Sequence, residues 1–263
     1  MIMIFAERID IMKYDAQDCE LVYKAQLTST VYDFRLKNKT LAKITKPGQF
    51  AQVAVFGKTL RRPISVCDVD NDVIRLVFEV RGEGTKILSD TKTGEKINII
   101  APLGNGFEIN PQKKTVFVGG GIGVPPLLYS AKQCGKNASV IIGFRNKDAV
   151  ILADDFRKTG CEPVITTDDG SFGINGFVTQ PLSQMIKDVD LICACGPTPM
   201  LKNIAKIAKE NNVECQVSLE QRMACGVGAC LGCAVAIKRS DGSEEYKHVC
   251  KDGPVFNAEE VVW

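Results

Sequence analysis

Four cysteines near the C-terminal end of the chain follow the spacing C-x4-C-x2-C-x16-C: Cys225, Cys230, Cys233 and Cys250. This is the plant-type ligand spacing for a 2Fe-2S cluster. Three glycines between the first and the third cysteine let one short loop hold three ligands, because glycine accepts positive φ and leaves room for sulfur. The spacing therefore predicts an iron-sulfur cluster on these four cysteines, and a chain that moves electrons.

A zinc site is the alternative for the same four residues. Structural zinc sites usually pair their cysteines as two close knuckles of the C-x2-C kind. Here only Cys230 and Cys233 are that close in the sequence. The spacing therefore favours the iron-sulfur interpretation.

The other seven cysteines are scattered singly or alternate along an apolar run, so we expect most of them to be small buried hydrophobic residues. The N-terminal sequence MIMIFAERIDIMKYD is apolar for only five residues before charged residues follow. We therefore expect no secretory leader, no disulfides and a reducing compartment, most simply the cytoplasm.

Charge and composition exclude several classes of function. The formal net charge is +2 over 263 residues, so the sequence offers no basic footprint for nucleic acid, and no apolar stretch is long enough to span a membrane. The single histidine, His248, excludes Ser-His-Asp hydrolysis, multi-histidine metal catalysis and a Rieske centre, which needs two histidines. The length suggests about two domains.

The first part of the chain, residues 1–110, is rich in strand patterns. Short alternating or apolar runs near 31–36, 52–56, 73–80 and 96–100 are separated by turn signals such as KPGQ and KTGE. Only the segment TKILSD looks helical there. Several short strands at such spacing predict an antiparallel β-barrel or a sandwich. We expect a barrel that forms the FAD-binding domain, for the reasons given below.

The rhythm changes beyond Pro111, where strand-like and helix-like segments alternate from TVFVGG to ECQVSL. This alternation predicts a doubly wound parallel sheet over residues 111–217, with ligand sites at the carboxyl ends of its strands. Residues 218–263 are rich in glycine and cysteine and form the expected small C-terminal cluster segment.

Two loops of the expected parallel sheet are candidates for a pyridine nucleotide. In TVFVGGGIGVPPLL, glycines lie between a strand and a helix, where a pyrophosphate needs bare backbone amides and the positive end of a helix. In CGPTPM, Gly196 ends a later strand and leaves a flat slot for a nicotinamide ring. Both loops should meet at one edge of the sheet. Cys195 is either in contact with the nicotinamide or a buried thiol at the strand end.

A nicotinamide and a 2Fe-2S cluster need a group between them, because hydride carries two electrons and the cluster accepts one at a time. A flavin can do both. The candidate segments are RRPIS, where an arginine can pair with phosphate, and RGEGT, which offers an amide and a hydroxyl at a helix start. Without that context, RRPIS can be an exposed turn and GEGT a capped helix start.

Taken in order, the motifs RPIS, GEGT, GGGIGVPP, CGPTPM and the four cysteines resemble those of ferredoxin-NADP reductase-type flavoproteins. The tail, SLEQRMACGVGACLGCAV followed by HVCKDGPVF, is similar to that of the electron-transfer subunit of class 1B dihydroorotate dehydrogenase, and the likeness covers essentially the whole chain. The resemblance implies that FAD is held by Arg62, Pro63, Ile64, Ser65, Val77, Phe78, Glu79, Gly84 and Thr85. It implies that NAD is held by Gly121, Gly123, Pro126, Cys195, Gly196, Pro197 and Met200, and the cluster by the four cysteines. Many reductases have an aromatic residue that stacks on the flavin where this chain has Ile64, and an aliphatic residue is expected there in the subunit that this chain resembles most.

The resemblance also implies a function: electrons pass between NAD(H), FAD and the cluster, and onward to FMN in a separate subunit that oxidises dihydroorotate in pyrimidine synthesis. It implies two copies of each chain in the complex. The alternatives are the small subunit of another NAD(P)H-linked ferredoxin reductase or of a sulfide dehydrogenase and, from a different class, a regulatory module that binds nucleotide and zinc. The sequence Arg145-Asn146-Lys147-Asp148 leaves NADH and NADPH both open, because it mixes basic and acidic residues.

Overall fold

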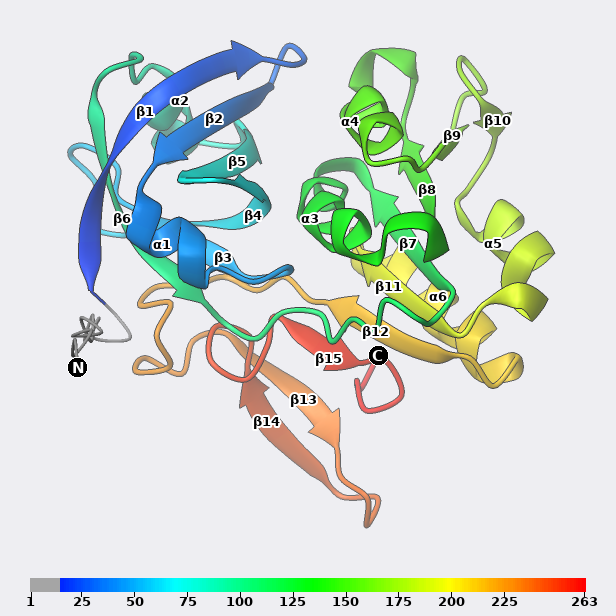
Figure 1. Ribbon diagram of the computed structural model, residues 1–263. Helices are drawn as coiled ribbons and strands as arrows, with labels where there is room; N and C mark the ends of the chain where they lie inside the picture. The colour runs from blue at the N-terminus through cyan, green and yellow to red at the C-terminus, as the bar shows by residue number, and fades with distance from the viewer. Residues whose placement is uncertain (1–14) are drawn as a thin grey trace, which may run out of the picture.

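The computed structural model describes residues 15–263, and it consists of a β-barrel and an α/β unit side by side with a C-terminal segment packed below both (Figure 1). The N-terminal sequence on which the expectation of no leader rests lies outside the described residues. Within residues 15–263, no helix is both long and apolar enough to cross a membrane.

Six antiparallel strands close into a barrel in the order β1-β2-β5-β4-β3-β6. Their bounds are β1 Ala16–Gln26, β2 Val31–Lys37, β3 Phe50–Val53, β4 Arg62–Asp70, β5 Val73–Glu79 and β6 Lys96–Leu103. Alternation places the apolar set of β6 inside, since Ile97, Ile99 and Ala101 are buried. The barrel prediction is confirmed. The alternative that RRPIS is an exposed turn is wrong, because these residues run into strand β4.

Two short helices border the barrel strands: α1 Lys39–Ile44 and α2 Glu83–Ser89. Asn38 caps α1, because its side chain accepts a hydrogen bond from the Leu41 amide at 3.0 Å. Helix α2 contains most of the expected helical segment TKILSD and begins two residues before it.

The α/β unit contains a seven-stranded sheet in the order β10-β9-β8-β7-β11-β12-β15. The bounds are β7 Thr115–Gly120, β8 Ala138–Phe144, β9 Val164–Thr167, β10 Ile174–Asn175, β11 Leu191–Cys195, β12 Glu214–Ser218 and β15 Val255–Asn257. The first six strands are parallel, which confirms the doubly wound sheet. Strand β7 is buried along its whole length, as a parallel strand covered on both faces should be.

Four α-helices and four 3-10 turns connect these strands: α3 Pro125–Cys134, α4 Ala153–Lys158, α5 Thr179–Met185, α6 Thr198–Glu210, η1 Gly121–Gly123, η2 Gly135–Asn137, η3 Lys147–Ala149 and η4 Ile186–Asp188. Helix α4 is shorter than the expected segment AVILADDFRKTG. The reason is local: Asn146 caps the separate turn η3, and Leu152 takes a left-handed φ of 62° before α4 starts.

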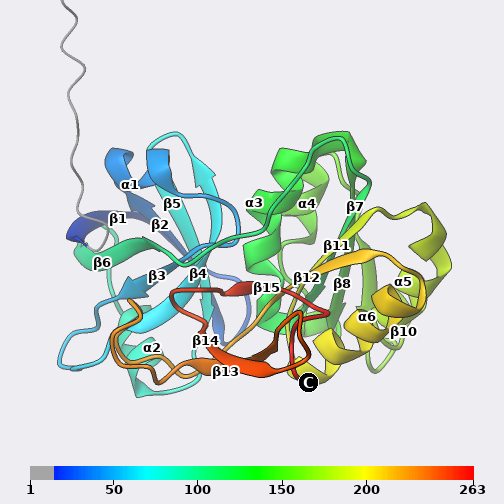
Figure 2. The same ribbon diagram turned by 90° about the horizontal axis from the view of Figure 1, so that it is seen from below.

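The cluster segment is joined to both larger units. It contains a hairpin, β13 Ala234–Lys238 and β14 Glu244–His248, and then β15, which pairs antiparallel with β12 of the large sheet. The separate segment expected over residues 218–263 did not include β15 as a seventh strand of the large sheet. From below, the segment lies across the junction of barrel and sheet (Figure 2). One hydrophobic cluster includes Phe50 of the barrel, Ile192 of the sheet and Cys250 of the segment, so the three units share packed interior.

Charged side chains link the barrel to the α/β unit. Arg75 of β5 makes a two-point contact with Asp33 of β2, at 3.0 and 2.9 Å, and also binds Asp155 of α4. Arg75 and Asp33 are buried. On the exposed side, Lys132 of α3 contacts Asp68 of β4 at 3.3 Å.

Candidate functional site

Backbone amides converge on the sulfur of Cys225. The N–H groups of Val227, Ala229 and Cys230 donate to Cys225 Sγ at 3.4, 3.3 and 3.4 Å. Burial raises the pKa of Cys225, but these amides and the Cys230 thiol outweigh burial and lower the pKa to about 6. The loop thus stabilises a thiolate, which is the form that binds iron.

The four sulfurs approach one another in two pairs. The Cys225 thiol interacts with Cys230, and Cys250 with Cys233. The Gly228 amide donates to Cys250 Sγ at 3.1 Å, and the Cys250 amide to Cys233 Sγ at 3.4 Å. Between residues 15 and 263, no three His, Cys, Asp or Glu side chains lie close enough to hold a single metal ion.

Two pairs of cysteine sulfurs with convergent amide donors are a donor set that fits a 2Fe-2S cluster, in which each iron takes two cysteines. Cys233 and Cys250 are buried, whereas Cys230 is exposed. The next residue, Leu231, is 60% exposed. One side of the loop therefore faces the interior and the other faces the surface.

The two arginines of the segment RRPIS make different contacts. Arg61 is held by the strands, because it donates to the carbonyls of Gln52 and Asn98 at 3.2 and 3.1 Å and to the Asn98 side chain at 2.6 Å. Arg62 lies across the start of α2, where a Cβ on Gly84 would be 2.4 Å from its guanidinium group. Gly84 thus leaves the space that Arg62 occupies.

Thr85 caps the start of helix α2. Its hydroxyl accepts hydrogen bonds from the amides of Arg81 and Gly82, at 3.0 and 3.2 Å, and donates to the Gly82 carbonyl. The interpretation of GEGT as a capped helix start is therefore correct, and the hydroxyl already has local partners. Arg62, Gly84 and Thr85 therefore lie close together at the start of α2.

The remaining expected flavin residues point to different sides of the barrel wall. Ile64 and Phe78 belong to the core inside the barrel, where the Phe78 ring packs edge-to-face on Phe34 at 5.0 Å. Val77 instead packs in the cluster of apolar residues shared with the α/β unit. Pro63 is exposed and Ser65 is half-buried.

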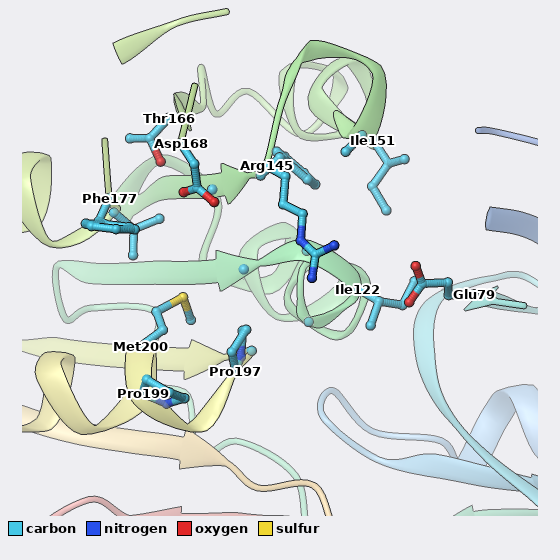
Figure 3. Close-up of a pocket in the computed structure, with 18 of the residues that line it drawn as sticks. Glu79, Ile122, Arg145, Ile151, Thr166, Asp168, Phe177, Pro197, Pro199 and Met200 are labelled. Carbon is cyan, nitrogen blue, oxygen red and sulfur yellow. The ribbon is translucent and has the colours of Figure 1, made fainter. Parts of the chain in front are cut away.

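A cavity of about 1050 Å³ opens between the barrel and the carboxyl ends of the parallel strands. Glu79 faces it from the barrel, and Arg145 and Met200 face it from the α/β unit (Figure 3). Six of the residues expected for cofactor binding line it: Glu79, Gly121, Gly123, Gly196, Pro197 and Met200. The other expected flavin residues, together with Pro126 and Cys195, are not among the lining residues.

The two glycine loops meet as expected. A Cβ on Gly123 would lie 2.5 Å from the Cys195 carbonyl oxygen and 2.6 Å from the Gly196 Cα. A Cβ on Gly196 would meet Met200 at 2.6 Å. The loops therefore touch through backbone, and no side chain fits between them. Burial raises the pKa of Cys195 to about 12, so this thiol lies neutral beneath the cavity.

The cavity also has lining residues that the sequence reasoning did not identify as site residues. Asp168 follows β9, Phe177 precedes α5, and Glu220 lies two residues beyond the end of β12. The rule that ligands bind at the carboxyl ends of parallel strands points to Asp168 and to Arg145. Glu220 carries no signal of its own, because it stands beside the nucleotide loops only after β12 has folded.

Comparisons with known proteins agree with this geometry. The family profile "iron-sulfur cluster binding domain of dihydroorotate dehydrogenase B" matches residues 220–262. The electron-transfer subunit of dihydroorotate dehydrogenase B (NAD(+)) from Caldanaerobacter subterraneus subsp. tengcongensis is 45% identical over 240 residues, which cover 90% of this chain and 95% of that protein. The subunit of the same name from Geobacillus sp. is 39% identical over 247 residues, with coverage of 90% and 94%.

Solved structures show the same architecture. A chain from an NADH-dependent reduced ferredoxin-NADP oxidoreductase, studied for flavin-based electron bifurcation, has a TM-score of 0.83 and 34% identity, with coverage of 93% of this chain and 90% of that one. The ferredoxin reductase of carbazole 1,9a-dioxygenase, at 18% identity and a TM-score of 0.63, shares the fold over 76% of this chain and 66% of its own. The resemblance seen in the motifs is thereby confirmed, as are an electron-transfer function and the cofactor set of FAD, NAD and a 2Fe-2S cluster. This chain belongs to the family of electron-transfer subunits of dihydroorotate dehydrogenase B.

Proposed function

We propose that this electron-transfer flavoprotein exchanges electrons with an FMN-containing catalytic subunit that oxidises dihydroorotate to orotate, with NAD+ as the final acceptor. The observation that carries the proposal is the position of the cluster loop. It packs against the barrel at Gly226, where a Cβ would lie 2.3 Å from the Gln52 side chain, and it exposes Cys230 and Leu231 on the opposite side. One face of the loop can therefore receive electrons from the barrel, and the other can be covered by a partner.

The barrel and the α/β unit divide the binding tasks. Bound FAD supplies a group that takes up two electrons as hydride and passes them on singly. Arg62 and the start of α2 are suited to its pyrophosphate, because a guanidinium group and free amides favour phosphate oxygens. Val77 packs in the apolar cluster that the barrel shares with the α/β unit, which leaves a flavin ring a place on that side of the barrel.

The cavity is suited to the nicotinamide nucleotide. Gly121 and Gly123 precede α3, whose Pro125 and Pro126 occupy the first helical turn, so amides at the positive end of the helix face a pyrophosphate. Gly196 and Pro197 line the same cavity beside them and add no bulky side chain. These assignments support hydride transfer across the junction of barrel and sheet.

Replacing Gly123 with Ala should weaken NADH binding. The added methyl group would meet the Cys195 carbonyl at 2.5 Å, and backbone cannot move aside as a side-chain tip can. Overpacking of this kind costs about 1–3 kcal/mol, so we expect the dissociation constant for NADH to rise roughly fivefold to a hundredfold. Titration of the FAD-loaded protein with NADH, followed by flavin absorbance under anaerobic conditions, measures it.

Gly135→Ala is the matched control, because Gly135 ends the same helix α3. Gly135 has a φ of 57°, and a Cβ there has nothing within 4 Å. This variant should lose stability by roughly 1–2 kcal/mol through left-handed strain and bind NADH as before. Equal NADH affinity for Gly123→Ala and the wild type would show that the two glycine loops do not form the nucleotide slot.

The catalytic partner should supply the dihydroorotate chemistry, because this chain belongs to a family of electron-transfer subunits. We propose two copies of this chain with two FMN-containing subunits. All eleven cysteines are free in the described part of the chain, which suits the reducing cytoplasm where pyrimidine synthesis would place the complex.

Mixing experiments test the proposal directly. The isolated chain should reduce dyes with NADH and should not oxidise dihydroorotate. Adding the FMN-containing dihydroorotate dehydrogenase subunit from the same cell should create NAD+-linked orotate formation, because the exposed cluster loop then has an electron donor against it. The absorbance of orotate in the ultraviolet and the absorbance of NADH measure the two products.

A second candidate function is the small subunit of an NADH-dependent ferredoxin-NADP oxidoreductase, favoured by the similarity of that structure at 34% identity. The relatives named as dihydroorotate dehydrogenase subunits reach 45% identity, which favours the first candidate. If the mixture forms no orotate while the chain alone reduces NADP+ or ferredoxin, the second function replaces the first. A colourless protein with zinc would instead support the regulatory module.

A further inference from the structure

Gln52 is a buried polar residue whose side-chain atoms have no protein partner. It lies in the middle of β3 with 0% of its surface exposed. Neither Oε1 nor Nε2 makes a hydrogen bond with any of the described residues. A buried amide without partners costs free energy that an apolar side chain of the same shape does not. The position therefore suggests a partner that is neither backbone nor side chain.

Gln52 lies between the segment RPIS, which is expected to bind FAD, and the cluster loop. Across the strands it pairs in register with Pro63 of the RPIS segment and with Ile100 of β6. Arg61 fixes its backbone by donating to the Gln52 carbonyl at 3.2 Å. The side chain fills the space in front of Gly226, because a Cβ there would lie 2.3 Å from Nε2 and 2.4 Å from Cγ.

Gly226 directly follows the first cluster cysteine. Its φ of 73° and its missing Cβ let the loop turn close over the Gln52 amide. The sulfur of Cys225 already accepts hydrogen bonds from three backbone amides of the loop, those of Val227, Ala229 and Cys230. The side-chain amide of Gln52, which lies beside Gly226, adds a donor that comes from the barrel instead of from the loop.

We propose that the Gln52 carboxamide donates a hydrogen bond to sulfur of the bound 2Fe-2S cluster unit, on a cluster sulfide or on the Cys225 ligand, and thereby acts as a positioning residue. The inference rests on the proposed function, since it requires the cluster. Hydrogen bonds to sulfur stabilise the more negative, reduced cluster and raise its reduction potential. Gln52 would thus help to set how readily the cluster accepts an electron from the barrel side.

The test is Gln52→Leu in the full-length, FAD-loaded, cluster-containing protein, followed by an anaerobic redox titration with electron paramagnetic resonance. Loss of one charge-assisted hydrogen bond should make cluster reduction about tenfold less favourable, which is about 59 mV for one electron. The resonance of the reduced cluster should change shape. Iron content, FAD content and the flavin potential should remain as in the wild type.

Gln216→Leu is the matched control. Gln216 is also a buried glutamine on a strand, but its side chain accepts from the Glu108 amide at 2.9 Å and donates to the Glu108 carbonyl at 3.0 Å. This variant should lose thermal stability and keep the cluster potential. If Gln52→Leu assembles too little cluster for titration, Gln52→Met removes the same donor with an unbranched side chain of similar length.

Two results would overturn the inference. An unchanged cluster potential and resonance, with equal or higher thermal stability, would mean that Gln52 is only an unpaired amide in the packing. A shift of the flavin potential with an unchanged cluster would place its partner on the flavin. A wild-type protein without iron would contradict the proposed cofactor set itself, which separates that failure from this one.

Discussion

Replacing Cys230 with Ser should remove the 2Fe-2S cluster while FAD and NADH-driven dye reduction remain. Cys230 is the exposed member of the four cysteines, so its loss opens the ligand set without disturbing the core that Cys233 and Cys250 help to fill. A serine oxygen is a harder and poorer ligand for cluster iron than a thiolate. Iron should fall from about two per chain towards none.

Three measurements on one sample separate the roles: iron content, the visible spectrum, and NADH-dependent reduction of a dye that takes electrons from flavin. Orotate formation with the partner subunit should be lost, because the exposed relay is gone. Cys19→Ala is the control, since Cys19 is a fully buried thiol in the barrel core and should leave the iron in place. If Cys230→Ser loses FAD and dye reduction together with iron, the cluster loop is needed for folding and the separation of roles fails.

The sequence was most informative where the information is local. Three of the four cysteines, Cys225, Cys230 and Cys233, lie in one loop, and the hairpin of β13 and β14 then returns the chain so that the Cys250 amide donates to Cys233 Sγ. Strand β6 alternates buried residues with half-buried ones after its exposed first residue, and its start, KINI, already shows this alternation in the sequence. The meeting of the two glycine loops also follows from local signals, because parallel strands end at one edge.

What could not be predicted depends on contacts between distant segments. Strand β15 has three residues, Val255–Asn257, and exists because β12 offers an unpaired edge. Glu220 lines the cavity because β12, which ends two residues before it, runs to that edge of the sheet. Gln52 reads as one polar residue in FAQV, and its significance appears only when Gly226 closes over it. No pattern of periodicity reports such a contact.

Arg75 links the barrel to α4 through Asp155 and is itself held inside the barrel by a buried ion pair with Asp33, so Asp33→Ala should be strongly destabilising. Arg75 would stay buried, and the two-point contact at 3.0 and 2.9 Å would be lost, which leaves only Asp155 of α4 to balance the charge. Removing one partner of a buried pair costs about 3–5 kcal/mol, mostly because the other charge remains desolvated. The melting temperature, measured with saturating FAD, should fall by roughly 2–4 °C for each kcal/mol.

Two further variants test the stated cause. Lys132→Met breaks the exposed contact with Asp68 at the same junction, and should cost about 1 kcal/mol or less because solvent screens that pair. The double variant Asp33→Leu with Arg75→Met removes both charges of the buried pair and should recover much of the lost stability, since apolar side chains can replace such a pair at little cost. If Asp33→Ala costs no more than Lys132→Met, or if the double variant is the least stable of the three, the desolvated arginine is not what makes this junction sensitive. The two units would then be held chiefly by the apolar packing of α3 against β4.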